Sequence, residues 1–194
     1  MRLLVGLGNP GPKHQRTRHN VGFRIGEEAA RKLDMDLGFE PRWNALVGKA
    51  RGVAVLLPQT FMNASGESVG HAARFWKVEA GSLVVAHDDI DLELGRIQVK
   101  VGGGDGGHTG LRSIQQHLGT PAFVRVRFGV GRPPPQWEGA DWVLARFSSA
   151  EEEQVQSLIP LAAEAAAAAL LEGPLLAMNR FNKRAKQKQT EQET

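Results

Sequence analysis

The chain contains no cysteine and no tyrosine among its 194 residues. Without cysteine it can form no disulfide, no thiolate metal site and no iron–sulfur cluster, and it has no cysteine nucleophile. Without tyrosine it has no phenol for acid–base catalysis. Thiol-dependent enzymes and disulfide-stapled domains are thereby excluded.

Long apolar runs are also scarce. The longest, Leu161 to Leu171, is about half the length of a membrane span and contains Glu164. The N-terminal segment reaches Gly6 and Asn9 too early for a signal peptide. We therefore expect a soluble cytoplasmic protein that does not bind membranes.

The length indicates a single domain, because a chain of this size buries roughly 70% of the surface that its unfolded form exposes. Hydrophobic residues make up 41% of the chain and charged residues 23%, which is typical of a globular protein. The formal net charge is +3, and Arg outnumbers Lys 16 to 8. Guanidinium groups match phosphate geometry, so this excess fits a nucleic-acid partner as well as an ordinary basic surface.

Apolar periodicity predicts strands and helices in alternation, and hence a layered α/β domain over residues 1–194. The expected strands are residues 3–5, 83–86, 96–101 and 124–130, with a hairpin over residues 45–57 that turns at Gly52. The expected helices are residues 21–33, 65–76 and 111–118, followed by an alanine-rich helix.

The alanine-rich helix has recognisable boundary signals. Ser149 and Glu152 have the spacing of a capping box, and Gly173-Pro174 is expected to end the helix. Pro160 is expected to start or kink it. A basic helical segment follows over about residues 175–194, with cations that either grip a nucleic-acid backbone or form a solvated tail: Arg180, Lys183, Arg184, Lys186 and Lys188.

Residues 6–11 read G-L-G-N-P-G after the first strand, which matches the dinucleotide fingerprint literally. That fingerprint requires a helix N-terminus to bind pyrophosphate, but Pro10 and Pro12 intervene and no helical pattern begins before Val21. The segment instead favours a strained turn that brings Asn9 close to a ligand.

His19 lies in the stretch Thr-Arg-His-Asn just before the first helix. Because histidine titrates near neutral pH, His19 can serve as a base, although a surface or capping role is the alternative. Asn20 can cap the helix through its side chain.

Residues 87–91 read H-D-D-I-D at the end of a buried strand, where open α/β sheets bind ligands. These side chains could hold a divalent metal, orient a distant histidine or form a solvated turn. No second histidine–carboxylate cluster supplies further metal ligands.

Two more segments are candidate substrate contacts. Residues 102–110 contain six glycines but lack the Lys-Ser/Thr ending of a Walker loop, which favours a lid or a close approach to substrate over a phosphate cradle. In residues 60–66, Phe61 and Met62 are of the type found in cores, and Asn63 is of the type that caps helices.

Taken in order, these segments resemble the bacterial-type peptidyl-tRNA hydrolases. The matching motifs are G-L-G-N-P-G, T-R-H-N-V-G-F, P-Q-T-F-M-N-A-S-G, V-A-H-D-D-I-D-L and G-G-G-D-G-G-H-T-G-L. They span Leu4 to Gly131, about two thirds of the chain. Five ordered motifs at family spacing make this resemblance specific.

The resemblance implies a monomer with a mixed, twisted central β-sheet flanked by helices. It implies hydrolysis of the ester that joins a nascent peptide to the 3′ ribose of tRNA, without metal or cofactor. His19 then corresponds to the catalytic base and Asp88 to the residue that orients it. The substrate contacts implied are Asn9, Phe61 and Asn63, with Lys100 and Arg127 holding the tRNA 5′-phosphate.

The chain departs from the family pattern at two positions. His14 stands where the family usually has a tRNA-contacting tyrosine, and Thr109 stands where it usually has asparagine. Two other functions are consistent with single motifs. One is a divalent-metal phosphoesterase that uses residues 87–91, and the other is a non-catalytic RNA-binding module.

Overall fold

A mixed seven-stranded sheet forms the centre of the computed structural model, which describes residues 1–182. The strand order is β2-β3-β4-β1-β5-β7-β6. The four central strands β4, β1, β5 and β7 run parallel, and β2, β3 and β6 are antiparallel to their neighbours. The strands are β1 (Arg2–Gly6), β2 (Gly38–Glu40), β3 (Ala45–Ala50), β4 (Val53–Pro58), β5 (Leu83–Asp89), β6 (Ile97–Val101) and β7 (Val124–Gly129).

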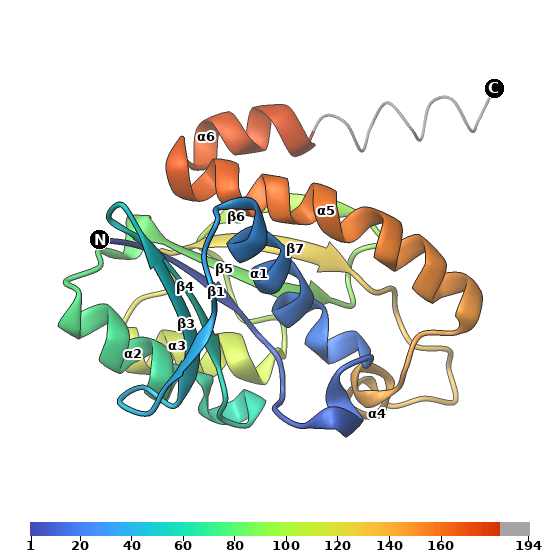
Figure 1. Ribbon diagram of the computed structural model, residues 1–194. Coiled ribbons are helices and arrows are strands. Elements are labelled where there is room, and N and C mark those ends of the chain that lie inside the picture. Colours follow the sequence, from blue (N-terminus) through green and yellow to red (C-terminus); the bar gives the residue numbers. More distant parts are fainter. Residues whose placement is uncertain (183–194) are drawn as a thin grey trace.

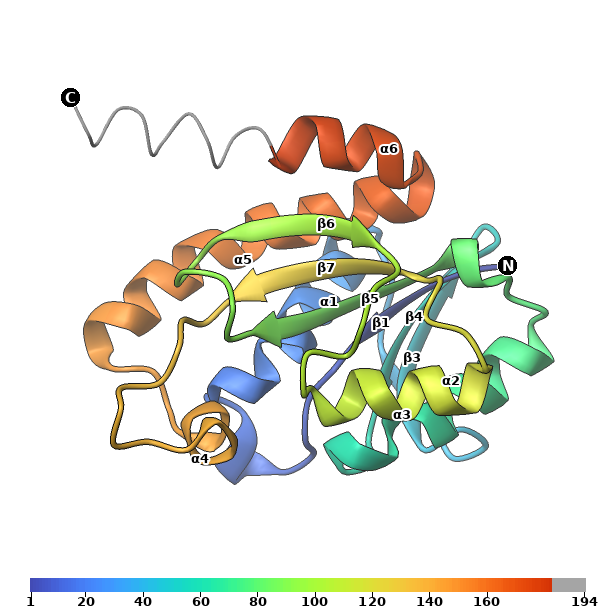
Figure 2. The same ribbon diagram turned by 180° about the vertical axis from the view of Figure 1, so that it is seen from behind.

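Helices cover both faces of the sheet, so the predicted α/β architecture with a mixed central sheet is confirmed (Figure 1). One face carries α1 and α5, and the view from behind shows α2 and α3 on the other face (Figure 2). The helices of residues 1–182 are α1 (Val21–Lys32), α2 (Ser65–Phe75), α3 (Thr109–Leu118), α4 (Gly139–Leu144), α5 (Ser149–Leu171) and α6 (Pro174–Ala177).

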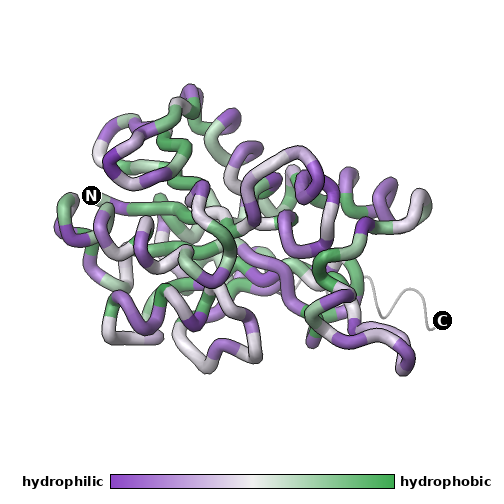
Figure 3. Tube along the Cα trace, turned by 90° about the horizontal axis from the view of Figure 1, so that it is seen from below, coloured by the Kyte–Doolittle hydropathy of each residue, from purple (hydrophilic) through white to green (hydrophobic). Residues whose placement is uncertain are grey.

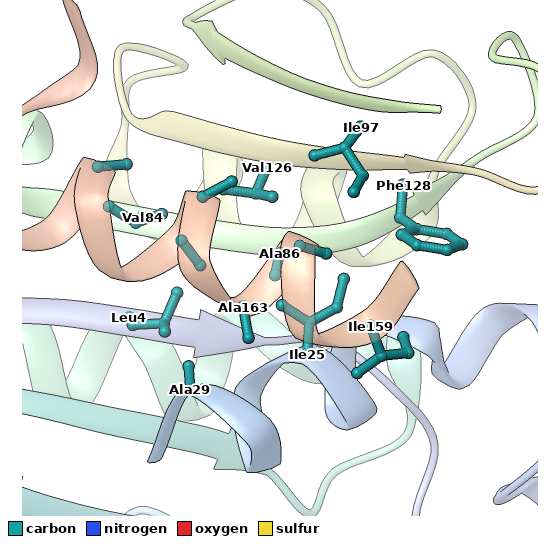
Figure 4. Close-up of a cluster of buried hydrophobic side chains, with 14 of the residues drawn as sticks. Leu4, Ile25, Ala29, Val84, Ala86, Ile97, Val126, Phe128, Ile159 and Ala163 are labelled. Atoms are coloured by element: carbon teal, nitrogen blue, oxygen red, sulfur yellow. The ribbon is translucent and has the colours of Figure 1, made fainter. Parts of the chain in front are cut away.

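Strands β1, β4 and β5 are buried on both faces, which explains their continuous apolar sequences. On the α1/α5 face, Leu4, Val84 and Val126 contact the small side chains of α5, such as Ala163 (Figure 4). On the other face, a second cluster joins the sheet to α2 and α3, and includes Val69 from α2 and Leu111 and Ile114 from α3. Apolar stretches thus run through the middle of the molecule, with hydrophilic stretches on the outer loops (Figure 3).

Glycine allows α1 to begin close to the carboxyl ends of β1 and β5. A Cβ atom at Gly22 would overlap the backbone oxygens of Leu7 and Ala86, so no other residue fits there without displacing the strands. This close approach brings the short 3₁₀ turn η2 (Arg18–Asn20), which precedes α1, against the end of β5.

Three details of the helices differ from expectation. The capping box of α5 is formed by Ser148 and Glu151, one residue before the predicted pair. Pro160 lies inside α5 and so does not start it, while a kink at Pro160 stays a prediction. Pro160 and Gln156, whose backbone carbonyl loses its hydrogen-bond donor at the proline, are both exposed to water. The sequence analysis also missed β2 and α4 altogether.

Helix α5 is long and apolar enough, by length and composition alone, to cross a membrane. Half of its most apolar stretch is buried inside the molecule, where α5 packs on α1 and the sheet. A single helix of this kind is weak evidence for a membrane span, and the packing is that of a core helix.

The two edges of the sheet differ. At one edge, β2 has three residues and exposes Phe39. At the other, the amide of Asn182 donates to the carbonyl oxygen of Val99 at 2.9 Å and accepts from its N–H at 2.8 Å. The end of the described chain therefore pairs with the edge strand β6. Of the predicted C-terminal basic run, Arg180 pairs with Glu172, and the cations from residue 183 onward lie outside the described residues.

Candidate active site

A cavity of about 460 Å³ lies at the carboxyl ends of the parallel strands, where α/β sheets bind ligands. His19 and Asp88 both line it. The remaining walls come from the turn after β4, from the glycine-rich loop before α3, and from α4. Segments far apart in the sequence thus meet in one cavity.

Two buried side chains, His19 and Asp88, form a hydrogen-bonded cluster in its floor with the partly buried His108. His19 Nδ1 lies 2.8 Å from Asp88 Oδ2 and 3.0 Å from Oδ1. His108 Nε2 lies 2.8 Å from Asp88 Oδ1, and the two imidazole rings are 4.8 Å apart between centroids. Asp88 is 2% exposed, so these two histidines take the place of water around its carboxylate.

The hydrogen bonds fix which ring nitrogens carry protons. His108 Nδ1 accepts from the backbone N–H groups of Gly110 and Leu111, at the N-terminus of α3, so its proton is on Nε2 and points to Asp88. An ionised carboxylate accepts only, so His19 likewise donates from Nδ1. The lone pair of His19 Nε2 is therefore left for another partner.

The pKa shifts reflect this arrangement. Burial lowers the pKa of His19, but the charge and hydrogen bond of Asp88 outweigh it and leave that pKa above its ordinary value. Burial raises the pKa of Asp88, but the two histidines hold it well below the usual range. Burial and the neighbouring His108 lower the pKa of His87 to about 3, so His87 is neutral.

Asn9 is fixed by its backbone and by its side chain. The Asn20 amide donates to the Asn9 carbonyl at 2.9 Å and accepts from the Asn9 N–H at 2.8 Å. Asn20 occupies the N-cap position of α1, as the sequence allowed, but its side chain makes no capping hydrogen bond because it binds Asn9 instead. The Asn9 Oδ1 atom accepts from the Met62 N–H at 2.8 Å, and its Nδ2 group has no partner within residues 1–182.

The predicted substrate contacts fall partly in this cavity. Phe61, Asn63 and Thr109 line it, and all three are exposed. Phe61 is 68% exposed and is not a core residue, and Asn63 caps no helix. His14 lies outside the cavity lining, on the turn η1 (Pro12–His14), where its carbonyl accepts from Thr17.

Lys100 and Arg127 lie on the neighbouring strands β6 and β7, but not directly opposite each other. Lys100 pairs in register with Arg125, and Arg127 pairs with Gln98. Lys100 and Arg127 are thus diagonal neighbours on one face of the sheet, roughly 7–8 Å apart. Arg127 donates to Asp89 at 2.8 Å and to Gln98, whereas no hydrogen bond or ion pair holds the Lys100 ammonium within residues 1–182.

The four residues of the metal hypothesis do not converge. His87 bonds the Asp88 carbonyl, Asp89 pairs with Arg127 and Asp91 pairs with Arg132. Within the described chain, the ligand atoms that do lie close together, within 4.8 Å, belong to His19, Asp88 and His108. Their facing nitrogens carry the protons that bind Asp88, so this donor set does not fit a metal.

His108 is the residue that the sequence analysis missed. It sits inside the glycine-rich loop that was singled out for its glycines alone. Its place immediately before an apolar helical period is that of an N-cap residue, and a histidine there was the available signal. Nothing in the sequence indicates that its second nitrogen reaches Asp88.

The comparisons with known proteins agree over nearly the whole chain. A sequence model of the peptidyl-tRNA hydrolase family matches residues 3–191. The peptidyl-tRNA hydrolase of Anaeromyxobacter dehalogenans is 46% identical over 190 residues, which cover 96% of this chain and 98% of that protein. That of Symbiobacterium thermophilum is 45% identical, with 93% and 98% covered. The crystal structure of peptidyl-tRNA hydrolase from Acinetobacter baumannii superposes with a TM-score of 0.87 at 36% identity, with 94% of each chain covered.

The fold and the site define an α/β enzyme with a histidine–carboxylate pair at the carboxyl edge of its sheet, a class suited to hydrolysis. The coverage and the sequence identity of the matches described above narrow this class to one family. The chain belongs to the peptidyl-tRNA hydrolase family, whose members are hydrolases of ester bonds.

Proposed function

We propose that this chain hydrolyses the ester bond between a peptidyl group and the 3′ ribose of tRNA, and that it acts in the cytoplasm as a monomer. The observation that carries the proposal is the His19 imidazole, oriented by Asp88 with Nε2 left free in the cavity. An ester of this kind needs only a positioned water and a base, because the ribose oxygen leaves more readily than an amine.

The base acts in two steps. His19 Nε2 takes a proton from water as the water oxygen attacks the ester carbonyl, and Asp88 stabilises the imidazolium that forms. The tetrahedral intermediate then expels the ribose 3′ oxygen, which receives the proton from His19. The products are a peptide with a free carboxylate and tRNA with a free 3′ hydroxyl.

Asn9 and Asn63 contribute polar contacts to the reacting group. The Asn63 amide can donate an N–H to the oxyanion as charge develops. Because the Met62 N–H donates to Asn9 Oδ1, the orientation of the Asn9 amide is fixed and its Nδ2 donors are available to the substrate. A charged α-ammonium would lose hydration beside these donors, whereas an N-acylated group would not, so the site favours blocked aminoacyl groups.

The proposed contact with the tRNA 5′-phosphate uses Lys100 and Arg127. Lys100 is free to bind a phosphate at once, whereas Arg127 must share its guanidinium with Asp89. Burial raises the pKa of Asp89, but hydrogen bonds from Arg127 and from the Asp91 N–H outweigh it and leave that pKa below its ordinary value, so Asp89 is ionised at neutral pH. Phosphate therefore competes with Asp89 for Arg127, and Lys100 provides the uncontested charge.

Incubation with N-acetyl-aminoacyl-tRNA tests the proposal directly. We expect release of free tRNA and of the N-acetyl amino acid, at a much lower rate when the α-amine is free. A matched reaction with the His19→Ala variant controls for spontaneous deacylation. Binding of tRNA without turnover would favour an RNA-binding module instead.

A further inference from the structure

Arg18, the neighbour of the catalytic histidine, is buried away from the cavity that His19 lines. Its side chain is 3% exposed. One terminal nitrogen, Nη1, donates to the carbonyls of Trp142, Ala145 and Arg146 at 3.4, 3.3 and 3.0 Å. The other, Nη2, donates to both carboxylate oxygens of Glu151 at 3.2 and 3.3 Å.

Aromatic rings complete the surroundings of this guanidinium. The Arg18 Cζ atom lies 3.5 Å from the centroid of the Trp142 ring and 5.2 Å from that of Phe147. Backbone contacts connect the turn η2 to the segment after α4 as well. The Arg18 N–H donates to the Ala145 carbonyl oxygen at 3.1 Å, and Thr17 forms a β-bridge with Arg146. Arg18 thus binds the end of α4, the segment after it and the first turn of α5.

Helix α4 needs this partner. It has six residues, no side-chain N-cap and no basic residue in its last turn, where unpaired carbonyls favour a cation. Arg18 supplies that cation from another part of the chain. A lysine could not replace it, since only a planar guanidinium can stack on Trp142 while it donates to several oxygens.

Helix α4 is also a wall of the active-site cavity. Ala140, Val143 and Leu144 line that cavity together with Ile90, so its surface on this side is apolar. Arg18 and His19 are neighbours in the turn η2, so the residue that carries the base is joined directly to the residue that contacts this wall.

Resting on the function proposed above, we propose that Arg18 is a positioning residue that sets substrate selectivity. It holds α4 so that Val143 and Leu144 contact the side chain of the amino acid esterified to tRNA. The enzyme therefore prefers a large apolar residue at that position to glycine, and loosening of α4 removes the preference without touching the base. Because Glu151 pairs with the Arg18 guanidinium, Arg18 affects substrate selectivity through the position of α4 and not through its charge.

The test compares Arg18→Lys with Arg24→Lys. Arg24 is a matched control, because its guanidinium also forms a two-point ion pair with α5, at Glu152, but forms no hydrogen bond or ion pair with α4 within residues 1–182. The substrates are N-acetyl-leucyl-tRNA and N-acetyl-glycyl-tRNA, whose turnover by the unmodified enzyme checks the proposed function separately. We expect Arg18→Lys to reduce the leucyl-to-glycyl ratio of kcat/KM about tenfold, mainly through KM for the leucyl substrate. The kcat for the glycyl substrate and the acid limb of its pH profile should stay unchanged, and Arg24→Lys should leave the ratio unchanged.

Hydrogen exchange gives a readout that needs no substrate. Amides of residues 139–147 should exchange faster in Arg18→Lys than in Arg24→Lys. Glu151→Gln, which keeps the capping box but weakens the ion pair, should shift both measurements in the same direction by less. An unmodified enzyme without a leucyl preference, or an equal loss of kcat for both substrates in Arg18→Lys, would overturn the inference. Unchanged exchange over residues 139–147 would overturn it as well.

Discussion

Replacement of Asp88 by asparagine isolates the charge that supports the base. Asp88 accepts hydrogen bonds from His19 and from His108, whereas an asparagine has one acceptor oxygen and one donor group. One of the two imidazoles must therefore face an N–H. If it is His19, the proton of that ring moves to Nε2 and the base is lost.

The magnitude follows from the contact. Two unit charges about 4 Å apart at an effective dielectric constant near 20 attract by about 4 kcal/mol. This energy stabilises the imidazolium that forms at His19, and each 1.36 kcal/mol is a factor of ten in rate. We therefore expect Asp88→Asn to lower kcat about 10³-fold, with little change in affinity for tRNA.

The pH profile of the same variant gives an independent check. In the unmodified enzyme the pKa of His19 lies above its ordinary value, so activity should be lost as pH falls through a value above about 6.5, where the ring becomes charged. Without the carboxylate, burial alone acts on His19 and lowers its pKa, so the acid limb should move to lower pH. The assay is kcat/KM for N-acetyl-aminoacyl-tRNA from pH 5 to 9. Asp91→Asn, which changes an exposed carboxylate of the same segment, is the control. A wild-type kcat in Asp88→Asn, or an acid limb that stays in place, would refute the reasoning.

Four further predictions concern the active site and its contact with tRNA. His19→Ala should lower kcat by about 10²- to 10⁴-fold while tRNA binding persists, as assays of turnover and binding will show. Activity of the unmodified enzyme should survive excess EDTA, because the proposed base acts on an ordinary water. Loss of activity on chelation that zinc restores would indicate a metal mechanism instead. His108→Ala should lower the free energy of unfolding by about 1 kcal/mol, because α3 loses its cap, and should slow turnover less than Asp88→Asn; thermal melts and initial rates measure both. Lys100→Ala should raise KM for 5′-phosphorylated tRNA more than Arg127→Ala does, and both effects should shrink once the phosphate is removed; equal effects on both tRNAs would reject the phosphate clamp.

Much of the fold could be predicted because its strands are strongly apolar. The central strands β1, β4 and β5 are covered on both faces, and burial of that kind leaves a continuous apolar run such as residues 3–5 or residues 53–57. Strand β2 was missed since its three residues are largely exposed and show no alternation. Helix α4 was missed because Arg18, from a distant part of the chain, stabilises it, and such a partner leaves no local signal.

The site was predicted through motifs more than through physics. The motifs selected His19 and Asp88, and the structure brings them into contact from residues 69 positions apart. His108 was missed because the hydrogen bond that matters depends on where the α3 N-terminus lies relative to β5. The direct pairing of Lys100 with Arg125 could not be predicted either, because a shift of the β6–β7 register by two residues would keep the same side chains on each face of the sheet.

The pairing of Asn182 with β6 has a consequence for how the chain acquires its final form. An exposed strand edge is a template on which a second chain can add a strand. The cover for β6 lies some 80 residues later in the sequence, at the end of the described chain. During synthesis the sheet can therefore assemble while the edge of β6 is still exposed. Another chain can add a strand to that edge until Asn182 has been synthesised and pairs with Val99.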